Sequence, residues 1–339
     1  MLNYLVKRIA LALLTITVIM TVSYVLLRLA PGDPARSSLI GETGGENMSS
    51  DKNVLSQNTA LRKKLYLDQP IYIGLFHWFK GVVTRGDFGD SAVVDAGRPV
   101  TQIILERLPV TLRLNFWAVL ITYLLAIPIG IYAAVAPDGF FDRATTILLF
   151  FLYSLPVIWV ALVLQATLCE GGLFPLFPLK GMASGPYTGM STWQIMWDSI
   201  RHYILPVTCL CYAGFAGLSR YARSSMLEVV HQDYIRTARA KGLSEHVILF
   251  KHALRNALIT LITLFAGLLP GLVAGSIITE YVFNINGMGS LSLLALNSRD
   301  YPLQMALFCF GGLLTLGGIM LSDILYVLTD PRITFNSRS

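Results

Sequence analysis

Residues 231–256 read HQDYIRTARAKGLSEHVILFKHALRN, a polar stretch between apolar segments that are long enough to span a membrane. Asp233 is placed as an N-cap, because its carboxylate can accept the first backbone N–H groups of a helix. Tyr234 to Lys241 then predict about two helical turns. Gly242 suits the left-handed residue that ends a helix. The pattern predicts a short helix that stops at a glycine.

A second helix is predicted after the glycine. Ser244 is placed to cap it, and Val247, Phe250 and Leu254 share one face at helical spacing. Basic residues outnumber acidic ones throughout this loop. The stretch therefore predicts a short helix, a glycine break and a basic amphipathic helix, all held between two membrane spans.

The short helix carries one strip that could bind a partner, made of Tyr234, Thr237, Ala238 and Lys241. Docking of such a strip into a groove on another protein is one hypothesis. The other is a basic anchor that lies on anionic lipid. The residue pattern alone leaves both open.

YIRTARAKGL, followed by HALRNA, resembles the cytoplasmic coupling loop of ABC importer permeases, and more narrowly that of the dipeptide, oligopeptide and nickel subfamily. The general signature of these loops is Glu-Ala-Ala, three residues, then Gly. Gly242 matches the glycine and Ala238 the second alanine. Arg236 stands in place of the glutamate and Thr237 in place of the first alanine.

The resemblance implies that this helix couples the chain to an ATPase. Tyr234 and Ala238 would fill a groove on the ATPase, Arg239 and Lys241 would pair with its acidic rim, and Gly242 would allow a sharp exit. The residues assigned to ATPase coupling are Asp233, Tyr234, Ile235, Arg236, Thr237, Ala238, Arg239, Ala240, Lys241 and Gly242.

Composition indicates an integral membrane protein. Of 339 residues, 54% are hydrophobic and only 14% are charged, whereas soluble domains run near 25% charged. The net charge of +6 is concentrated in one loop, which indicates membrane orientation rather than nucleic-acid binding. The four cysteines lie in or beside apolar segments without a CxxC motif, so we interpret them as small buried hydrophobes.

Six membrane-spanning helices are predicted, so the fold class is an all-α integral membrane protein. The apolar run at 9–27 is long enough to span a bilayer and is interpreted as a retained first span. The other five are predicted at 110–135, 144–168, 203–222, 257–283 and 303–328. Six spans put both termini in the cytoplasm, together with the loops 137–143 and 225–256, as the positive-inside rule requires.

The resemblance extends over essentially the whole chain and implies a type I ABC importer permease fold. It rests on PGDP (31–34), LRKKLYLDQP (61–70), GDFGDS (86–91), ERLPVTLRL (106–114), EYVFNINGMG (280–289), RDYP (299–302) and DPRI (330–333). The expected domains are an N-terminal transmembrane helix (1–30), an extracytoplasmic subdomain (31–105), a permease core (106–330) and a cytoplasmic tail (331–339). Within the subdomain, residues 71–83 predict a short amphipathic helix at the membrane interface.

The fifth predicted span carries glycines at a spacing of four. Gly267, Gly271 and Gly275 would form a smooth helix face beside Pro270, at which the helix is expected to bend. Tight packing inside the membrane and a helix at the translocation pathway both explain this pattern. The resemblance favours the pathway.

Several chemistries are absent from the sequence. It has no P-loop motif, no H-E-x-x-H and no G-x-S-x-G, so ATP binding by a P-loop and the commonest zinc-protease and serine-hydrolase activities are not expected. Charged residues deep inside the predicted spans are scarce, whereas ion-coupled carriers place carboxylates or histidines there. The chain is therefore expected to have no enzymatic activity, no cofactor and no metal site of its own.

The hypothesis is a permease subunit of an ATP-driven dipeptide or oligopeptide uptake system in a bacterial inner membrane. Its expected partners are a homologous second permease, two ATPases that carry ATP and Mg²⁺, and an extracytoplasmic substrate-binding protein. The same machinery for nickel or another small solute stays open, as does an ion-coupled secondary carrier. Two further alternatives stay open. A membrane enzyme would need a catalytic cluster that faces one side of the membrane, and a passive scaffold would bind partners without substrate flux.

Overall fold

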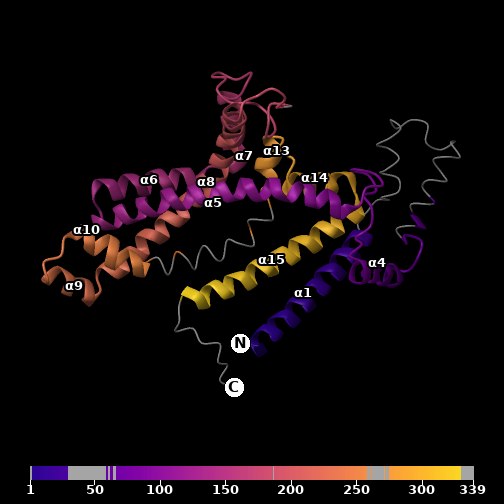
Figure 1. Cartoon of the computed structure of the whole chain (residues 1–339), viewed down its shortest axis with the longest axis horizontal. Helices are drawn as coiled ribbons and strands as arrows, with labels where there is room; N and C mark the ends of the chain where they lie inside the picture. Colours follow the sequence, from indigo (N-terminus) through magenta and orange to yellow (C-terminus); the bar gives the residue numbers. More distant parts are fainter. Residues whose placement is uncertain are drawn as a thin grey trace. The chain divides into compact units, whose positions relative to one another are not determined.

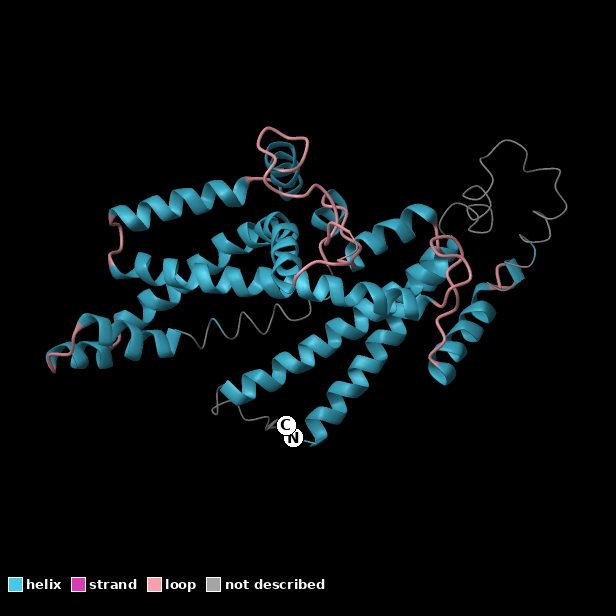
Figure 2. Cartoon of the chain, turned by 45° about the horizontal axis from the view of Figure 1, so that its top comes forward, coloured by secondary structure: helices cyan, strands magenta, loops and turns pink. Residues whose placement is uncertain are grey.

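The protein is seen in a computed structural model that describes residues 2–29, 59, 62–63, 66–185, 187–257, 261, 271 and 275–329. These residues form helices joined by turns, with two isolated β-bridges (Figures 1 and 2). In chain order the helices are α1 (Leu2–Leu29), α4 (Ile71–Arg85), α5 (Val100–Val135), α6 (Phe140–Ser154), α7 (Val157–Leu168), α8 (Thr192–Val230), α9 (Asp233–Ala240), α10 (Glu245–Val247), the π-helix η1 (Ile248–Ala253), α13 (Ile277–Val282), α14 (Met288–Ser298) and α15 (Tyr301–Thr329). The all-helical class is confirmed for this part of the chain.

Three of the described helices are long and apolar enough to cross a membrane: Val6–Leu29 within α1, all of α5, and Tyr301–Leu321 within α15. Two further candidates arise if α6 with α7, and the two halves of α8, are each counted as one bent span. The described residues therefore hold three to five candidate spans. Most of the span predicted over 257–283 lies outside them, as do the motifs at 31–34 and 330–333 and the tail 331–339.

The run predicted as a single span over 144–168 is two helices, α6 and α7, that meet at 93°. The break falls at Leu155 and Pro156, whose backbones are extended. Proline disfavours helical backbone at the residue before it and cannot donate a hydrogen bond to the preceding turn. By contrast, α5 continues through Pro128, and α8 continues through Pro206.

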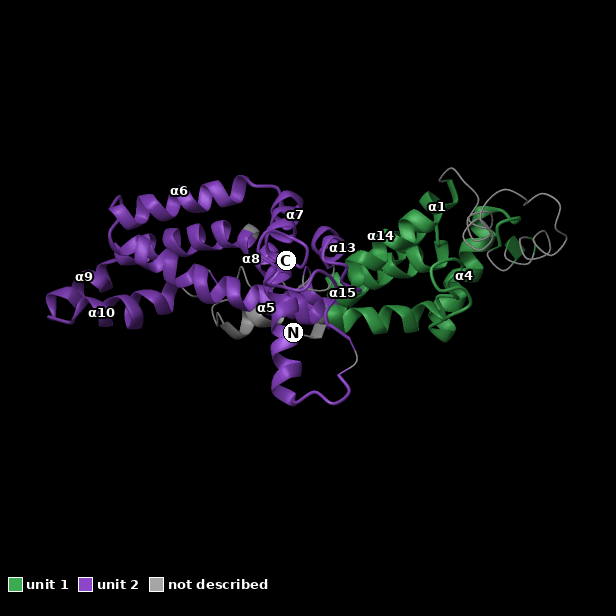
Figure 3. Cartoon of the chain, turned by 90° about the horizontal axis from the view of Figure 1, so that it is seen from above, with its two compact units in different colours: residues 1–110, 287–317 green, residues 111–286, 318–339 purple. Residues whose placement is uncertain are grey.

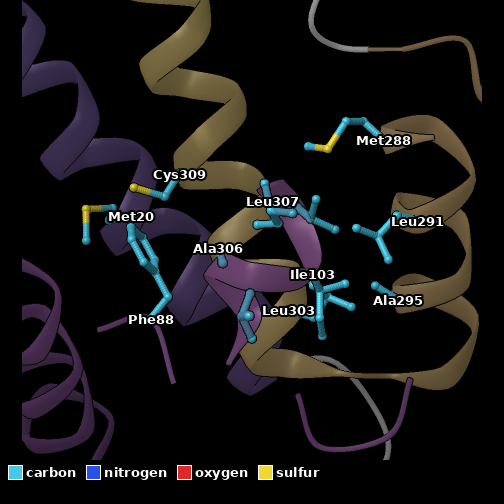
Figure 4. Close-up of a cluster of buried hydrophobic side chains, with 12 residues drawn as sticks. Met20, Phe88, Ile103, Met288, Leu291, Ala295, Leu303, Ala306, Leu307 and Cys309 are labelled. Atoms are coloured by element: carbon cyan, nitrogen blue, oxygen red, sulfur yellow. The ribbon is translucent and has the colours of Figure 1, made fainter. Parts of the chain in front are cut away.

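The chain divides into two compact units, of which the first contains residues 1–110 and 287–317 and the second residues 111–286 and 318–339 (Figure 3). One buried apolar cluster holds the first unit together, with side chains from α1, α5, α14 and α15 and from the loop before α5 (Figure 4). Its members are Met20, Phe88, Val100, Ile103, Ile104, Met288, Leu291, Ala295, Leu303, Ala306, Leu307 and Cys309. The first unit thus joins segments from the two ends of the chain.

A single carboxylate joins the loop after GDFGDS to the start of α15. Asp300 is fully buried, and its oxygens accept hydrogen bonds from the successive backbone N–H groups of residues 92–94 at 3.0–3.2 Å. The Ser91 hydroxyl donates to the same carboxylate, and the N–H of Leu303 donates to it at 3.3 Å, so that Asp300 also caps α15. Successive N–H groups of this kind form an anion-binding nest. The sequence motifs GDFGDS and RDYP are therefore the two sides of one buried contact.

In the second unit, α5 and α8 approach each other closely at Gly130. A Cβ atom added there would lie 2.6 Å from the carbonyl oxygen of Ser219 and 2.9 Å from the backbone nitrogen of Arg223. Both are backbone atoms of α8, which cannot move without moving the helix. Small residues allow such close approach between membrane helices.

Gly130→Ala is expected to destabilise the fold by about 1–3 kcal/mol, because the added methyl group must push α8 away from α5. Gly217→Ala is the matched control, since a Cβ atom there meets nothing within 4 Å. Thermal unfolding of the detergent-solubilised variants measures the difference. Equal unfolding temperatures for the two variants would contradict this account of the helix contact.

The four cysteines, Cys169, Cys209, Cys211 and Cys309, are free and buried. Their interpretation as small buried hydrophobes is confirmed.

Candidate functional site

The predicted short helix is α9, but its N-cap is Gln232 and not Asp233. Asp233 is the first helical residue, and its side chain is 97% exposed and lies 3.6 Å from the guanidinium of Arg236. No side-chain capping hydrogen bond is formed at this end. The prediction for Asp233 was wrong by one position, although a negative charge in the first turn still favours the positive end of the helix dipole.

The C-terminal end of α9 is built as predicted. Gly242 has a left-handed backbone with φ of +75°, which glycine adopts without steric cost. Its N–H donates to the carbonyl of Arg239 at 2.9 Å, and the N–H of Leu243 donates to the carbonyl of Ala238 at 3.4 Å. These two bonds form a Schellman motif, which ends the helix and turns the chain sharply.

One face of α9 is buried inside the chain. Ile235 and Ala238 are 0% and 9% exposed. They lie in an apolar cluster with residues of α5, α8 and the following helix, namely Ile131, Ala134, Met226, Ile248, Leu249, Ala253 and Ala257. The expectation that Ala238 fills a groove on a partner is therefore corrected. An eight-residue helix is not stable alone, so its apolar side chains pack against the spans of the same chain.

The buried face of the helix after Gly242 differs from the predicted one. Its middle, η1, is π-helical, and Ile248, Leu249 and Ala253 are its buried residues. The predicted face was Val247, Phe250 and Leu254, of which Phe250 is 37% exposed and none is fully buried. The i→i+5 bonds of a π-helix place residues five apart one above the other, which a 3.6-residue period does not anticipate. Ser244 stands at the N-cap of α10 as predicted, without a side-chain capping bond.

Two polar contacts connect α9 to the helical stretch 245–257, which we call the returning helix. The guanidinium Nε of Arg239 lies 2.8 Å from Glu245 Oε1. At the other end, the amide of Asn256 donates a hydrogen bond of 2.7 Å to the hydroxyl of Tyr234. Arg239 and Tyr234, both expected to contact a partner, thus already bind within the chain.

The other face of α9 is open. Asp233, Arg236, Thr237, Ala240 and Lys241 are all exposed, and they recur at the three- and four-residue spacing of one helix face. The helix is therefore anchored by its apolar face and presents a polar face that contains both signs of charge.

A buried ion pair lies between α8 and the first turn of α6. Asp142 is 3% exposed, and its carboxylate receives Nε and a terminal nitrogen of Arg223, each at 2.6 Å. The N–H of Asp138 adds a third hydrogen bond at 2.9 Å. The hydrogen bonds from Arg223, against the opposing effect of burial, hold the pKa of Asp142 below its ordinary value. This pair fastens α8 close to where the chain enters the 225–256 loop.

This pair could not be predicted from the sequence, because its two residues are 81 positions apart and each resembles an ordinary charge beside a span. The same holds for a contact between Thr111 on α5 and Glu280 on α13, where the hydroxyl donates to the carboxylate at 3.0 Å. Both groups are fully buried. The only sequence signal was a charged residue next to an apolar run.

Of the four residues predicted for the fifth span, Gly267 and Pro270 lie outside the described residues. Gly271 is exposed, and a Cβ atom there would meet nothing within 4 Å. Gly275 has φ of +75°, so it supplies a left-handed backbone immediately before α13. The role of these glycines at the pathway stays a prediction.

Comparison with known proteins identifies the family. The family described as "binding-protein-dependent transport system inner membrane component" matches residues 126–335, which include the whole α9 region, and its N-terminal counterpart matches residues 1–115. The chain belongs to this family. The predicted membership among ABC importer permeases is confirmed.

Relatives match the permease over its full length. The oligopeptide transport system permease protein AppB of Bacillus subtilis is 35% identical over 333 residues, which cover 98% of this chain and 99% of AppB. The peptidoglycan transport system permease protein YejB of Agrobacterium fabrum is 31% identical over 362 residues, covering 99% of each chain.

A solved structure supports the fold of the permease. An inward-facing structure of the MetNI methionine ABC transporter aligns with a TM-score of 0.53 over 68% of this chain and 97% of that chain, at 15% sequence identity. This likeness concerns the fold alone. The permease is a multi-pass membrane protein of an importer family that works with other subunits.

Proposed function

We propose that this permease forms the translocation pathway of an ATP-driven peptide uptake system and that α9 is the element through which an ATPase moves it. The observation that carries the proposal is the division of α9 into two faces. Ile235 and Ala238 anchor the helix in the apolar cluster of the second unit. Arg236, Thr237 and Lys241 are left exposed to receive a partner.

Anchoring of this kind suits transmission of force. A helix whose apolar face is packed against α5 and α8, and whose ends are tied by Arg239–Glu245 and Tyr234–Asn256, moves together with the spans below it. Close packing transmits displacement because interiors are nearly incompressible. Closure of two ATPases would then turn the paired permeases between inward- and outward-facing states.

Peptides are the proposed substrate because AppB is named for oligopeptide transport and YejB for peptidoglycan transport. Nickel or another small solute carried by the same machinery is the alternative. An ion-coupled secondary carrier would differ from both of these importers in its energy source, which would be an ion gradient and not ATP. Uptake by intact cells should stop when ATP is depleted and persist when the proton and sodium gradients are collapsed.

The remaining assembly follows from this role. A second, homologous permease would complete the pathway, and two cytoplasmic ATPases would bind the ATP and Mg²⁺ that this chain is not expected to hold. Six spans would place both termini in the cytoplasm. A binding protein would deliver substrate to the 31–105 and 284–302 regions. The buried contact of Asp300 with residues 92–94 holds part of these two regions together and supports this proposal.

Photo-cross-linking tests the docking of α9. p-Benzoylphenylalanine placed at Thr237 or Ala240, on the open face, is expected to capture an ATPase in intact cells. Phe250 on the returning helix is the matched control, since the probe closely resembles phenylalanine and the site is outside the open face. Ala238 is unsuitable, because a bulky group there would disrupt the anchor.

Capture of phospholipid alone from both Thr237 and Ala240 would contradict the docking proposal. Equal capture of the ATPase from Phe250 would also contradict it, because the partner would then not be specific to the open face of α9.

A further inference from the structure

Helix α4 in the first unit presents two different exposed strips. Tyr72, Phe76 and Val83 form an apolar strip at helical spacing, with exposed fractions of 72%, 65% and 65%. His77, Lys80 and Thr84 form a polar strip beside it, and all three are exposed. On a helix that met only water, the open side would typically be polar, without a continuous apolar strip.

The third side of α4 packs into the protein. Gly74 and Gly81 are buried, and Trp78, Phe79 and Val82 pack against the apolar cluster of the first unit. Trp78 points inward, although it belongs to a helix predicted for the membrane interface, and its ring stacks on Tyr24 with centroids 6.2 Å apart. The inward face of α4 is therefore already packed against the protein, and the apolar strip is a separate, exposed surface.

Two contacts fix the level of α4 along the membrane helix α1. The guanidinium of Arg28, at the end of the apolar run of α1, donates a hydrogen bond of 2.7 Å to the carbonyl of Gln69, just before α4 begins. Tyr24, one turn deeper in α1, contacts Trp78 and closely approaches Gly74. Helix α4 therefore starts at the level where α1 leaves the membrane and runs back beside its last turns (Figure 1).

This position of α4 indicates that lipid covers the apolar strip. The neighbouring side chains Leu26 and Leu29 at the end of α1 are 62% and 67% exposed and belong to a membrane span. A helix at the same level that carries aromatic residues on one strip and a lysine on the next has the composition of a helix lying in the membrane interface. Lys80 can extend its charged end toward lipid headgroups while its stem stays on the apolar side.

We propose that α4 is a lipid-contacting helix beside the last turns of α1, whose Tyr72, Phe76 and Val83 side chains are inserted into the bilayer leaflet at which α1 ends. The helix anchors the first unit to the lipid surface independently of any ATPase contact. Its polar strip faces the aqueous side of the interface.

Spin-label accessibility tests the insertion in the full-length protein reconstituted in phospholipid vesicles. Nitroxides are attached at Tyr72→Cys, Phe76→Cys and Val83→Cys, and at His77→Cys and Thr84→Cys as matched positions on the polar strip. Leu26→Cys supplies the lipid reference on α1. The four native thiols are buried, and wild-type protein treated with the same reagent gives their background labelling.

The apolar strip is expected to collide several-fold more often with oxygen, which concentrates in lipid, than with a water-soluble nickel chelate. The polar strip should show the reverse preference. Preference for the chelate at both strips would overturn the proposal, because α4 would then lie in water. Protection of the apolar strip from both reagents would overturn it equally, because a protein would then cover the strip. Three labelled positions keep the test decisive if one variant fails to fold.

Discussion

Asp300→Ala is expected to destabilise the first unit by roughly 3–4 kcal/mol, because it leaves several buried donors without their acceptor and removes the N-cap of α15. The carboxylate is 0% exposed and is the shared acceptor for the Ser91 hydroxyl and the N–H groups of residues 92–94. The loop after GDFGDS should therefore lose its fixed position against α15.

Hydrogen exchange measures this effect directly. Amides 92–94 are expected to lose protection in Asp300→Ala, together with a lower unfolding temperature of the whole chain. Asp87→Ala is the matched control from the same segment, since its carboxylate is exposed and accepts a hydrogen bond of 2.8 Å from the N–H of Gly89. That control should cost less than about 1 kcal/mol. Unchanged protection of 92–94 in Asp300→Ala would refute the role of the nest.

The second large effect is expected at the ion pair between Asp142 and Arg223, and it should be asymmetric. Arg223→Ala leaves a carboxylate that is 4% exposed without its cation, for which we expect a loss of about 3 kcal/mol or more. Asp142→Ala leaves a guanidinium that is 31% exposed and can reach water, so its cost should be nearer to 1 kcal/mol. The two single variants would cost the same if the pair were evenly solvated.

The pH dependence of stability tests whether the cation of Arg223 is what stabilises the buried carboxylate of Asp142. The pKa of Asp142 is lowered in the folded protein, so the pair contributes its full stability above the unfolded value of 3.8 and loses it as the pH falls through the lower folded value. In Arg223→Ala the same burial acts without the cation, so the pKa of Asp142 is expected to rise above 3.8. The stability difference between wild type and Arg223→Ala should therefore shrink as the pH is lowered toward 3.8. Denaturant unfolding in detergent measures it, and a difference independent of pH would contradict the assignment.

Helix α9 and the residues around it show what local sequence can predict and what it cannot. Gly242 was predictable because a left-handed helix end depends on the backbone of one residue and strongly favours glycine. Asp233 was misplaced by one position because Asp is favoured both as a cap and in the first turn, where it stabilises the dipole without a capping bond. The partner assigned to Ala238 was wrong because a two-turn helix buries its small and apolar residues against its own chain first.

The prolines inside the apolar runs show more clearly where local sequence stops being sufficient. Pro156 is one of several prolines in apolar runs, and its local restriction on Leu155 is the same as at any X-Pro pair. Yet α5 passes through Pro128 whereas α6 and α7 break at 93°. Which proline breaks a helix depends on the neighbours available to hold the freed backbone groups, and that information is tertiary.

The sequence by itself determined that this protein is helical and membrane-embedded, that it belongs to the importer permeases, and that helix α9 ends at Gly242, because hydropathy, glycine backbone freedom and a contiguous motif are local properties. Only the tertiary structure decided that Asp300 is enclosed by residues 92–94, that Arg223 holds Asp142, and that α9 turns Ile235 inward and Arg236 outward. Each of these depends on burial and on partners distant in sequence, which a one-dimensional pattern does not contain.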